Sequence, residues 1–285
     1  MKPFIEKLPV AENNSFVAKT HATPLFEVPW HKHIEYELIL FTAGEGSSFI
    51  GNYVGEFKTG DIFFLGSNLP HTFQKANKEL FTSAVVVHFK EDFWGKAFME
   101  LPETRSIREL FNTYAKGLRI TGDSRKMLNT LIVELEYLTG FQRIIRLCEC
   151  LQLIAEKNEF EKVSTQDVEE MNPKNQERID IIFQHTIANF QEPLSLQSIA
   201  AHARMSIPAF CSYFKKSTKK TYIDFLNEVR VSHACKQLMD TQMTIEQICY
   251  DSGYNSLANF NKQFLKVKKV TPSQYRKMFL KRELV

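Results

Sequence analysis

Two hydrophobic periodicities divide the chain. Between residues 16 and 89, short apolar runs alternate with glycines, which predicts short β-strands joined by tight turns, as in a sandwich or a small barrel. The clearest runs are Tyr36–Phe41, Ser47–Ile50, Asp61–Leu65 and Ser83–Phe89. From residue 106 onward, apolar residues recur at helical spacing, so the rest of the chain is predicted to be α-helical.

The helical part starts with three predicted helices and then changes composition. These helices are Ser106–Leu118, Asp123–Leu138 and Phe141–Lys157. The third has an apolar stripe wide enough to pack on the sheet and also to supply a subunit interface. Residues 158–175 are polar and acidic, which favours a linker. We therefore expect an N-terminal domain at 1–157, a linker at 158–175 and a C-terminal domain at 176–285.

One pattern occurs twice in the C-terminal part, at Leu194–Thr221 and at Met243–Arg276. Each copy starts with an N-cap type of residue, Ser195 or Thr244, before an apolar run at helical spacing. A short turn follows, and then a second short helix with two phenylalanines four residues apart. Residues at this spacing share one helix face, which must be buried. The pairs are Phe210 with Phe214 and Phe260 with Phe264.

The opposite face of each second helix is polar and basic. It carries Ser212, Lys215 and Lys216 in the first copy and Asn259, Asn261, Lys262 and Lys266 in the second. This is the layout of a helix-turn-helix, in which one face packs and the other reaches a DNA duplex. A small helical bundle with solvated lysines is the alternative, and two copies in register disfavour it. A predicted long helix, Tyr222–Met239, would hold the two units at a fixed separation.

Two such units on one connector can enter successive major grooves, which lie about 34 Å apart. We expect the second unit to read bases, since Asn pairs with adenine and Lys with guanine. Its readers would be Asn259, Asn261 and Lys262, on a surface that Asn255, Ser256 and Leu257 extend. The matching residues of the first unit are poor hydrogen-bonders, namely Pro208, Ala209, Cys211 and Ser212. Candidate phosphate contacts, which position the protein without specifying sequence, are Ser206, Lys215, Lys216, Lys266 and Arg276.

A second constellation lies among the predicted strands. His31, His33 and Glu37 have the spacing His-x-His-x₃-Glu, and on an unbroken strand these odd-numbered residues would share one face. His71 on a neighbouring strand would complete a set of three imidazoles and one carboxylate. Such a set suits a divalent transition metal, Zn, Fe, Mn or Ni. In the alternative, the same residues line the mouth of a small barrel, where a small organic effector binds.

Composition bounds the class of protein. The chain of 285 residues is 44% hydrophobic and 24% charged, typical of a globular protein with enough apolar material for two cores. It contains no apolar run of transmembrane length and no signal peptide, and its five cysteines include no CxxC pair. We therefore expect a cytoplasmic protein with reduced thiols and no membrane partner.

Charge separates the two halves of the chain. Residues 1–174 carry 20 Lys and Arg against 24 Asp and Glu, whereas residues 175–285 carry 16 against 9. The C-terminal part is therefore basic beside a mildly acidic N-terminal part. This asymmetry agrees with a polyanion such as DNA as the partner of the C-terminal part.

The second copy resembles the signature of the AraC/XylS family of transcriptional regulators, and the resemblance covers about the last hundred residues. It rests on Ile-Cys, Gly-Tyr, Phe, Gln-Phe and Thr-Pro-Ser-Gln-Tyr-Arg in that order within Met243–Arg276. The chain departs from the family pattern at Arg204, Lys219 and Lys269, where glycine is usual. The His-x-His-x₃-Glu segment is similar to the first cupin motif, and Gly60 to His71 to part of the second.

The resemblance implies an α+β chain: a cupin-like β-barrel or sandwich followed by helices, and an all-α domain with two helix-turn-helix units joined by a long helix. It implies a ligand-responsive DNA-binding regulator and activator rather than an enzyme. The implied partners are promoter DNA, a small-molecule effector, RNA polymerase and a second copy in a homodimer. Two alternatives stay open: a metal-dependent cupin enzyme fused to a DNA-binding domain, and an N-terminal domain that serves only for dimerisation.

Overall fold

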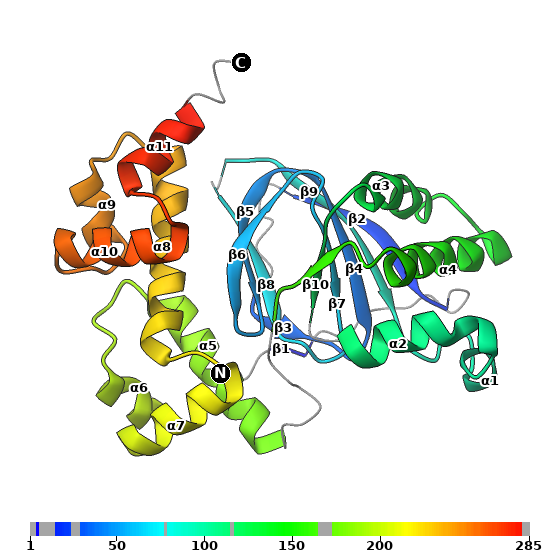
Figure 1. The fold of residues 1–285 in the computed structure, drawn as a ribbon, viewed down its shortest axis with the longest axis horizontal. Coiled ribbons are helices and arrows are strands. Elements are labelled where there is room, and N and C mark those ends of the chain that lie inside the picture. The colour runs from blue at the N-terminus through cyan, green and yellow to red at the C-terminus, as the bar shows by residue number, and fades with distance from the viewer. Residues whose placement is uncertain are drawn as a thin grey trace. The chain divides into compact units, whose positions relative to one another are not determined.

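The computed structural model of the chain describes residues 4–5, 15–23, 29–76, 79–114, 117–164 and 173–280. The chain divides into two compact units, one of residues 4–53 and 57–168 and the other mainly of residues 169–285. The first unit is rich in strands and the second is helical (Figure 1), which confirms the predicted fold class. Among the described helices, none is both long enough and apolar enough to cross a membrane.

Two sheets build the N-terminal unit. The first has the strand order β1 (Phe4–Ile5), β3 (His31–Lys32), β8 (His71–Lys75), β5 (Glu45–Ile50) and β6 (Tyr53–Lys58). The second has the order β11 (Phe160–Lys162), β10 (Leu118–Ile120), β7 (Ile62–Leu65), β4 (Tyr36–Ala43), β9 (Thr82–Phe89) and β2 (Val17–Thr23). The strand-rich region predicted between residues 16 and 89 is therefore present, as a sandwich of two sheets.

Side chains that alternate along the strands form two separate cores, one between the two sheets and one between a sheet and the helices. In β4, Ile39 and Phe41 belong to an apolar cluster formed with residues of both sheets, whereas Leu38 and Leu40 belong to a cluster formed with helices. The helical elements of this unit are α1 (Lys96–Met99), a 3₁₀ turn (Pro102–Thr104), α2 (Arg105–Tyr114), α3 (Ser124–Glu134) and α4 (Gly140–Lys157). Because successive side chains of a strand point to opposite faces, Glu37 lies on the inner face with Ile39.

One helix boundary predicted in this unit was wrong. The helix predicted to run to Leu118 ends at Tyr114, and Leu118 instead begins β10 and pairs with Phe64 of β7. Gly117, at φ +90°, lies between the two elements, and this backbone conformation interrupts a helix. Strand β11 and the start of helix α5 at Pro173 fall inside the range predicted as a linker. Residues 165–172 of that range lie outside the described residues.

Seven helices follow in the C-terminal unit. They are α5 (Pro173–Asn189), α6 (Leu196–His202), α7 (Ile207–Thr218), α8 (Tyr222–Asp240), α9 (Ile245–Asp251), α10 (Leu257–Lys268) and α11 (Pro272–Leu280), within described residues 173–280. Ser195 and Thr244 each form a capping box at the start of α6 and α9. The pairs α6–α7 and α9–α10 are the two predicted helix-turn-helix units, and α8 is the predicted connector. Their four repeat phenylalanines are fully buried.

The departures from the family pattern fall where the backbone is left-handed. Lys219 and Lys269 end α7 and α10 at φ 61° and 62°, and Arg204 in the first turn has φ 55°. Glycine adopts this conformation without strain, whereas other residues meet a steric cost. Each lysine Nζ donates to a carbonyl of the preceding helical turn, Lys219 to Lys216 and Lys269 to Lys266, at 3.2 and 2.9 Å. The lysines thus cap the carbonyl ends that they terminate.

Candidate effector site and DNA-binding surface

The predicted ligand set comes together at the end of the sandwich interior. His31 begins β3 and lies opposite His71 of β8 in the first sheet, whereas Glu37 lies on β4 of the second sheet. One ligand atom from each of His31, His33, Glu37 and His71 lies within 4.8 Å of the others, and all four residues are buried.

The expectation that His31, His33 and Glu37 lie on one strand and its entry turn was wrong, because His31 belongs to a separate strand. The chain leaves β3 after Lys32 and enters β4 of the other sheet at Tyr36, so that His33 lies in the crossing segment. The side chains converge because the two strands face each other across the interior, not because they share a pleated face. The spacing of these residues in the sequence does not predict that the chain crosses from one sheet to the other between them.

Backbone carbonyls orient three of the imidazoles. The Nδ1 atoms of His31, His33 and His71 lie 2.8, 3.0 and 2.9 Å from the carbonyl oxygens of Pro29, Glu35 and Leu69, in that order. A carbonyl oxygen only accepts a hydrogen bond, so each Nδ1 carries the hydrogen. In each neutral ring Nε2 is then the nitrogen that can act as a ligand, and those of His33 and His71 lie close to the same carboxylate oxygen.

Oxygen Oε2 of Glu37 is the meeting point of the cluster. It lies 3.0 Å from Nε2 of His33, 3.2 Å from Nε2 of His71 and 3.0 Å from Nε2 of His88. His88 was not identified from the sequence. It is placed by the β-ladder, because β9 pairs with β4 so that His88 is directly opposite Glu37. His88 could have been predicted to lie on the inner face, because it follows Ala84 and Val86 at every second position of the strand.

Burial and close contacts perturb the titration of these groups. Burial, followed by the nearby His71, lowers the pKa of His31 to about 3. Burial also works against a charged His33, but the Glu37 carboxylate outweighs it and raises the pKa of that imidazole. For Glu37, burial favours the neutral acid, yet the surrounding histidines hold its pKa well below the usual value. Glu37 is therefore a buried carboxylate whose charged form is stabilised by the surrounding histidines.

Aromatic side chains fill the interior beside the cluster. Phe41 stacks on Phe57 with ring centroids 3.9 Å apart, and the ring of Phe73 lies 5.1 Å from Phe41 and 5.7 Å from Phe63. His71 is 6.1 Å from Phe73, so the polar cluster adjoins this packed layer directly. The interior near the cluster is dense and apolar.

The donor set fits a divalent transition metal. Imidazole and carboxylate ligands suit Zn, Fe, Mn and Ni, and ligating histidines characteristically donate the second ring N–H to a carbonyl or a carboxylate. His31, His33 and His71 have this arrangement through their Nδ1 atoms. These three residues and Glu37 would hold the metal, which would supply positive charge in the site.

The predicted DNA-contacting residues lie on the surface of the two helix-turn-helix units. Most of them are exposed, namely Ser206, Pro208, Ala209, Cys211, Ser212, Lys215, Lys216, Asn255, Leu257, Asn259, Asn261, Lys262 and Lys266, and Ser256 is partly exposed. Ser206 and Ser256 also have a structural task, since their side chains cap α7 and α10. The second helices thus present the expected faces to solvent.

Two of the predicted phosphate contacts already have protein partners. Arg276 donates from Nη2 to the carbonyl of Met243 at 2.7 Å and from Nε to that of Leu238 at 3.3 Å, which attaches α11 to the end of α8. Lys266 of α10 binds Asp224 of α8 at 2.6 Å. Hydrogen bonds from Lys266, and then from Thr221, lower the pKa of Asp224. These contacts give Arg276 and Lys266 roles in packing that their charge did not reveal.

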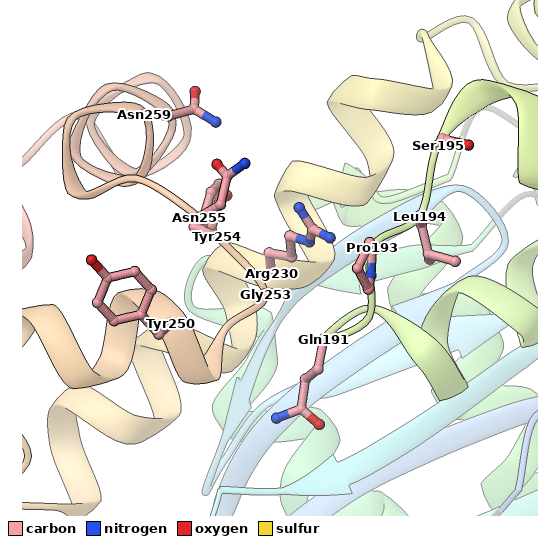
Figure 2. Close-up of a pocket in the computed structure, with 10 residues that line it drawn as sticks. All are labelled: Gln191, Pro193, Leu194, Ser195, Arg230, Tyr250, Gly253, Tyr254, Asn255 and Asn259. Carbon is pink, nitrogen blue, oxygen red and sulfur yellow. The ribbon is translucent and has the colours of Figure 1, made fainter.

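A groove of about 610 Å³ separates the two helix-turn-helix units (Figure 2). Leu194 and Ser195 line it on the side of α6, and Asn255 and Asn259 line it on the side of α10. The remaining lining residues are Gln191, Pro193, Arg230, Tyr250, Gly253 and Tyr254. Two predicted DNA-contacting residues therefore face the space between the units.

Polar contacts at the base of this groove attach the segment between α5 and α6 to α8 and α9. Arg230 of α8 donates to the carbonyls of Phe190 and Glu192 at 2.8 and 3.0 Å, and Gln191 donates to the carbonyl of Asp251 at 2.8 Å. At Gly253, with φ +82°, a Cβ atom would lie 2.6 Å from the carbonyl oxygen of Phe190. Sequence patterns do not reveal these contacts, because the partner residues lie far apart in the chain.

Two family models match the chain. An AraC-like ligand binding domain matches residues 14–93, and a helix-turn-helix domain matches residues 199–278. The first covers most of the sandwich strands together with the His and Glu cluster. The second covers the connector and both repeat units except the start of α6.

Several relatives and solved structures match the chain at low identity. The HTH-type transcriptional activator RhaR of Mannheimia succiniciproducens is 22% identical over 279 residues, which is 93% of this chain and 92% of RhaR. The HTH-type transcriptional regulator YdiP of Escherichia coli is 28% identical over 100 residues, 35% of this chain and 33% of YdiP. Among solved structures, ToxT from Vibrio cholerae is 15% identical with a TM-score of 0.38, covering 93% of this chain and 98% of ToxT.

Proposed function

Because the chain belongs to the AraC family of transcriptional regulators, we propose that it binds promoter DNA through both helix-turn-helix units under the control of an effector in the strand-rich unit. One observation carries this proposal. The two repeat units each bury one face of their second helix and expose the other, and Gln191, in the loop before the first unit, donates to the carbonyl of Asp251 in the second. Such a pair is suited to meet one duplex at two places.

In this proposal the two second helices enter successive major grooves, about 34 Å apart. Helix α10 reads bases through Asn259, Asn261 and Lys262, whose exposed side chains offer amide and ammonium donors. Helix α7 reads less sequence, because its matching surface consists of Pro208 and Ala209 with other weak hydrogen-bonders. Lys215 and Lys216 then contact phosphates and hold α7 in place without specifying bases.

We further propose that the chain forms a homodimer through its α3–α4 region. Large apolar side chains stand exposed there: Met127 on α3 is 59% exposed, Tyr137 in the following loop 79% and Phe141 at the start of α4 72%. Apolar helix faces of this kind are commonly buried by a second copy. A dimer would present four helix-turn-helix units and lengthen the recognised site.

Activation through contact with RNA polymerase in the cytoplasm completes the proposal, and the name of the RhaR relative, an activator, supports it. The matched relatives are transcriptional regulators, so we assign the His and Glu cluster to effector binding rather than to catalytic turnover. The effector site proposed here comprises His31, His33, Glu37 and His71.

Selection from a pool of random-sequence duplexes tests this function directly. The full chain should enrich duplexes with two short sequence blocks whose centres lie about 10 base pairs apart. The double variant Asn259→Ala, Lys262→Ala should lose one block and retain the other. Recovery of duplexes without any shared sequence would contradict sequence-specific binding.

A further inference from the structure

We propose that Asp224 competes with the DNA backbone for Lys266, and that this carboxylate therefore lowers the affinity of the chain for every duplex, whatever its sequence. Asp224 lies in the first turn of α8, and its Oδ1 atom accepts a hydrogen bond from Nζ of Lys266 on α10 at 2.6 Å. The inference rests on the proposed function, because it concerns the face of α10 that is proposed to meet the duplex. It places a residue that opposes DNA binding on the connector helix.

The position of Lys266 on α10 is the first argument. Asn259, Lys262 and Lys266 are exposed and follow one another at intervals of three and four residues, so they share one face of the helix. In helix-turn-helix proteins the N-terminal residues of the second helix contact base edges. Lys266 lies one turn beyond Lys262, towards the C-terminal end. A lysine at this place is suited to contact a phosphate, which positions the protein without specifying sequence.

The fixed carboxylate of Asp224 is the second argument. Its backbone N–H donates to Oγ1 of Thr221, the N-cap residue of α8, at 3.1 Å, and the Thr221 hydroxyl donates to Oδ2 at 2.6 Å. The other oxygen, Oδ1, is the one that accepts from Lys266. Hydrogen bonds from Lys266 and then from Thr221 lower the pKa of Asp224, so the group is charged at neutral pH. The first turn of a helix also favours a negative charge.

The exposure of this ion pair is the third argument. The Lys266 side chain is 61% exposed and that of Asp224 is 37% exposed, so a phosphate can reach the ammonium group. Water weakens the attraction within an exposed ion pair, and a partner is exchanged there at low cost. When Lys266 turns to a phosphate, Asp224 keeps its charge but loses its partner beside a polyanion. The lost ion pair and the repulsion between carboxylate and phosphate both reduce the affinity for DNA.

A second ion pair of α8 supplies a matched comparison. Glu228 lies one turn after Asp224 and accepts from Nζ of Lys220 at 2.7 Å. Lys220 lies between α7 and α8, outside both second helices. Neutralising Glu228 therefore changes the net charge of the chain as neutralising Asp224 does, but it leaves the hydrogen bond to Lys266 in place.

The test uses the full chain and two probes, a duplex selected from the random pool and a duplex of scrambled sequence. The variants Asp224→Asn and Lys266→Gln and their combination form a double-mutant cycle for DNA affinity. The controls are Asp224→Glu, which keeps the charge, and Glu228→Gln, which removes a charge from the same helix. Affinities are measured between about 50 and 200 mM salt, the range in which phosphate contacts lose strength. Circular dichroism verifies that each variant is folded.

Asp224→Asn should bind both duplexes about two- to fivefold more tightly, the range expected for the loss of an exposed ion pair. The gain should be equal for the two duplexes, because a phosphate contact carries no sequence information. The slope of log affinity against log salt should become steeper by up to about 0.9, the contribution of one phosphate contact. In the Lys266→Gln background most of the gain should disappear, because no lysine is released. Asp224→Glu and Glu228→Gln should bind like the wild type.

Three results would overturn the inference and leave the proposed function intact, since in each the wild type still selects a shared sequence. One is an unchanged affinity in Asp224→Asn. Another is weaker binding by this variant, because Asp224 would then direct Lys266 towards the phosphate. The third is an equal gain in Glu228→Gln, which would reveal a general effect of net charge. A wild type that binds neither duplex would contradict the proposed function, and the inference would fail with it.

Discussion

Two lysines at helix ends show how single residues fit a backbone that disfavours them. Lys219 and Lys269 occupy left-handed positions at the ends of α7 and α10, and each donates from its N–H to the carbonyl four residues earlier and from Nζ to the carbonyl three residues earlier. The side-chain bond offsets part of the steric cost. The repeat is therefore preserved in its backbone even where its usual residue is replaced.

Glycine at either position should stabilise the chain. Lys219→Gly or Lys269→Gly removes a left-handed strain of about 1–2 kcal/mol but loses the Nζ bond and adds entropy to the unfolded chain, for a net gain of about 0.5–1 kcal/mol. The matched control is Lys215→Gly, three residues before the end of α7, which should cost about 1 kcal/mol. Urea unfolding followed by circular dichroism measures both. A destabilising effect of Lys219→Gly equal to that of Lys215→Gly would contradict the assigned cap.

At the scale of elements, local patterns predicted the C-terminal unit better than the N-terminal one. Its helices carry their own caps and buried faces within about ten residues, so Ser195, Thr244 and the paired phenylalanines sufficed to place them. The sandwich depends on pairings between distant strands. Residue spacing therefore did not predict that the chain crosses from β3 to β4 of the other sheet. It also did not predict that His88 pairs with Glu37.

Helix α10 should carry most of the sequence specificity. Lys262→Ala should relax preference at one base pair and weaken binding of the selected duplex by about 1–3 kcal/mol, because a base contact is lost. Lys216→Ala on α7 is the matched control: it should weaken all duplexes alike and reduce the salt slope by about 1. Competition binding against single-base variants of the duplex measures both. Equal effects of the two substitutions on every duplex would contradict the assignment of Lys262 as a base reader.

The packing of α8 against α9 should respond to pH. Burial lowers the pKa of His233, although Asp251, with Oδ2 3.6 Å from Nε2, acts in the opposite direction. A lowered pKa means that the unfolded chain takes up the proton more readily, so stability is lost as pH falls below about 6.5. Replacement by His233→Gln should reduce the loss between pH 7.5 and 5.5. Other titrating groups contribute equally to the wild type and to the His233→Gln variant. The difference between their urea midpoints at each pH therefore reports the contribution of His233 to stability. A difference that does not change with pH would contradict this account.

At the scale of the whole molecule, the two units differ in content in the way that the charge asymmetry of the sequence indicated. The basic C-terminal part holds the repeat, and the mildly acidic N-terminal part holds the buried His and Glu cluster. The sequence sufficed for this division because charge and periodicity are distributed along whole segments. It was insufficient for the carbonyls that hold the histidines and for the contacts of Arg230 with the loop between α5 and α6, because only the folded backbone brings these groups together.

The central claim is that two linked helix-turn-helix units read one duplex. Methylation interference at guanine N7 on a selected duplex tests it most directly, since N7 lies in the major groove. The account predicts two patches of interference on one side of the duplex, centred about one helical turn apart, with the patch assigned to α10 lost in the Asn259→Ala, Lys262→Ala variant. A single patch, or two patches that both persist in the variant, would contradict it.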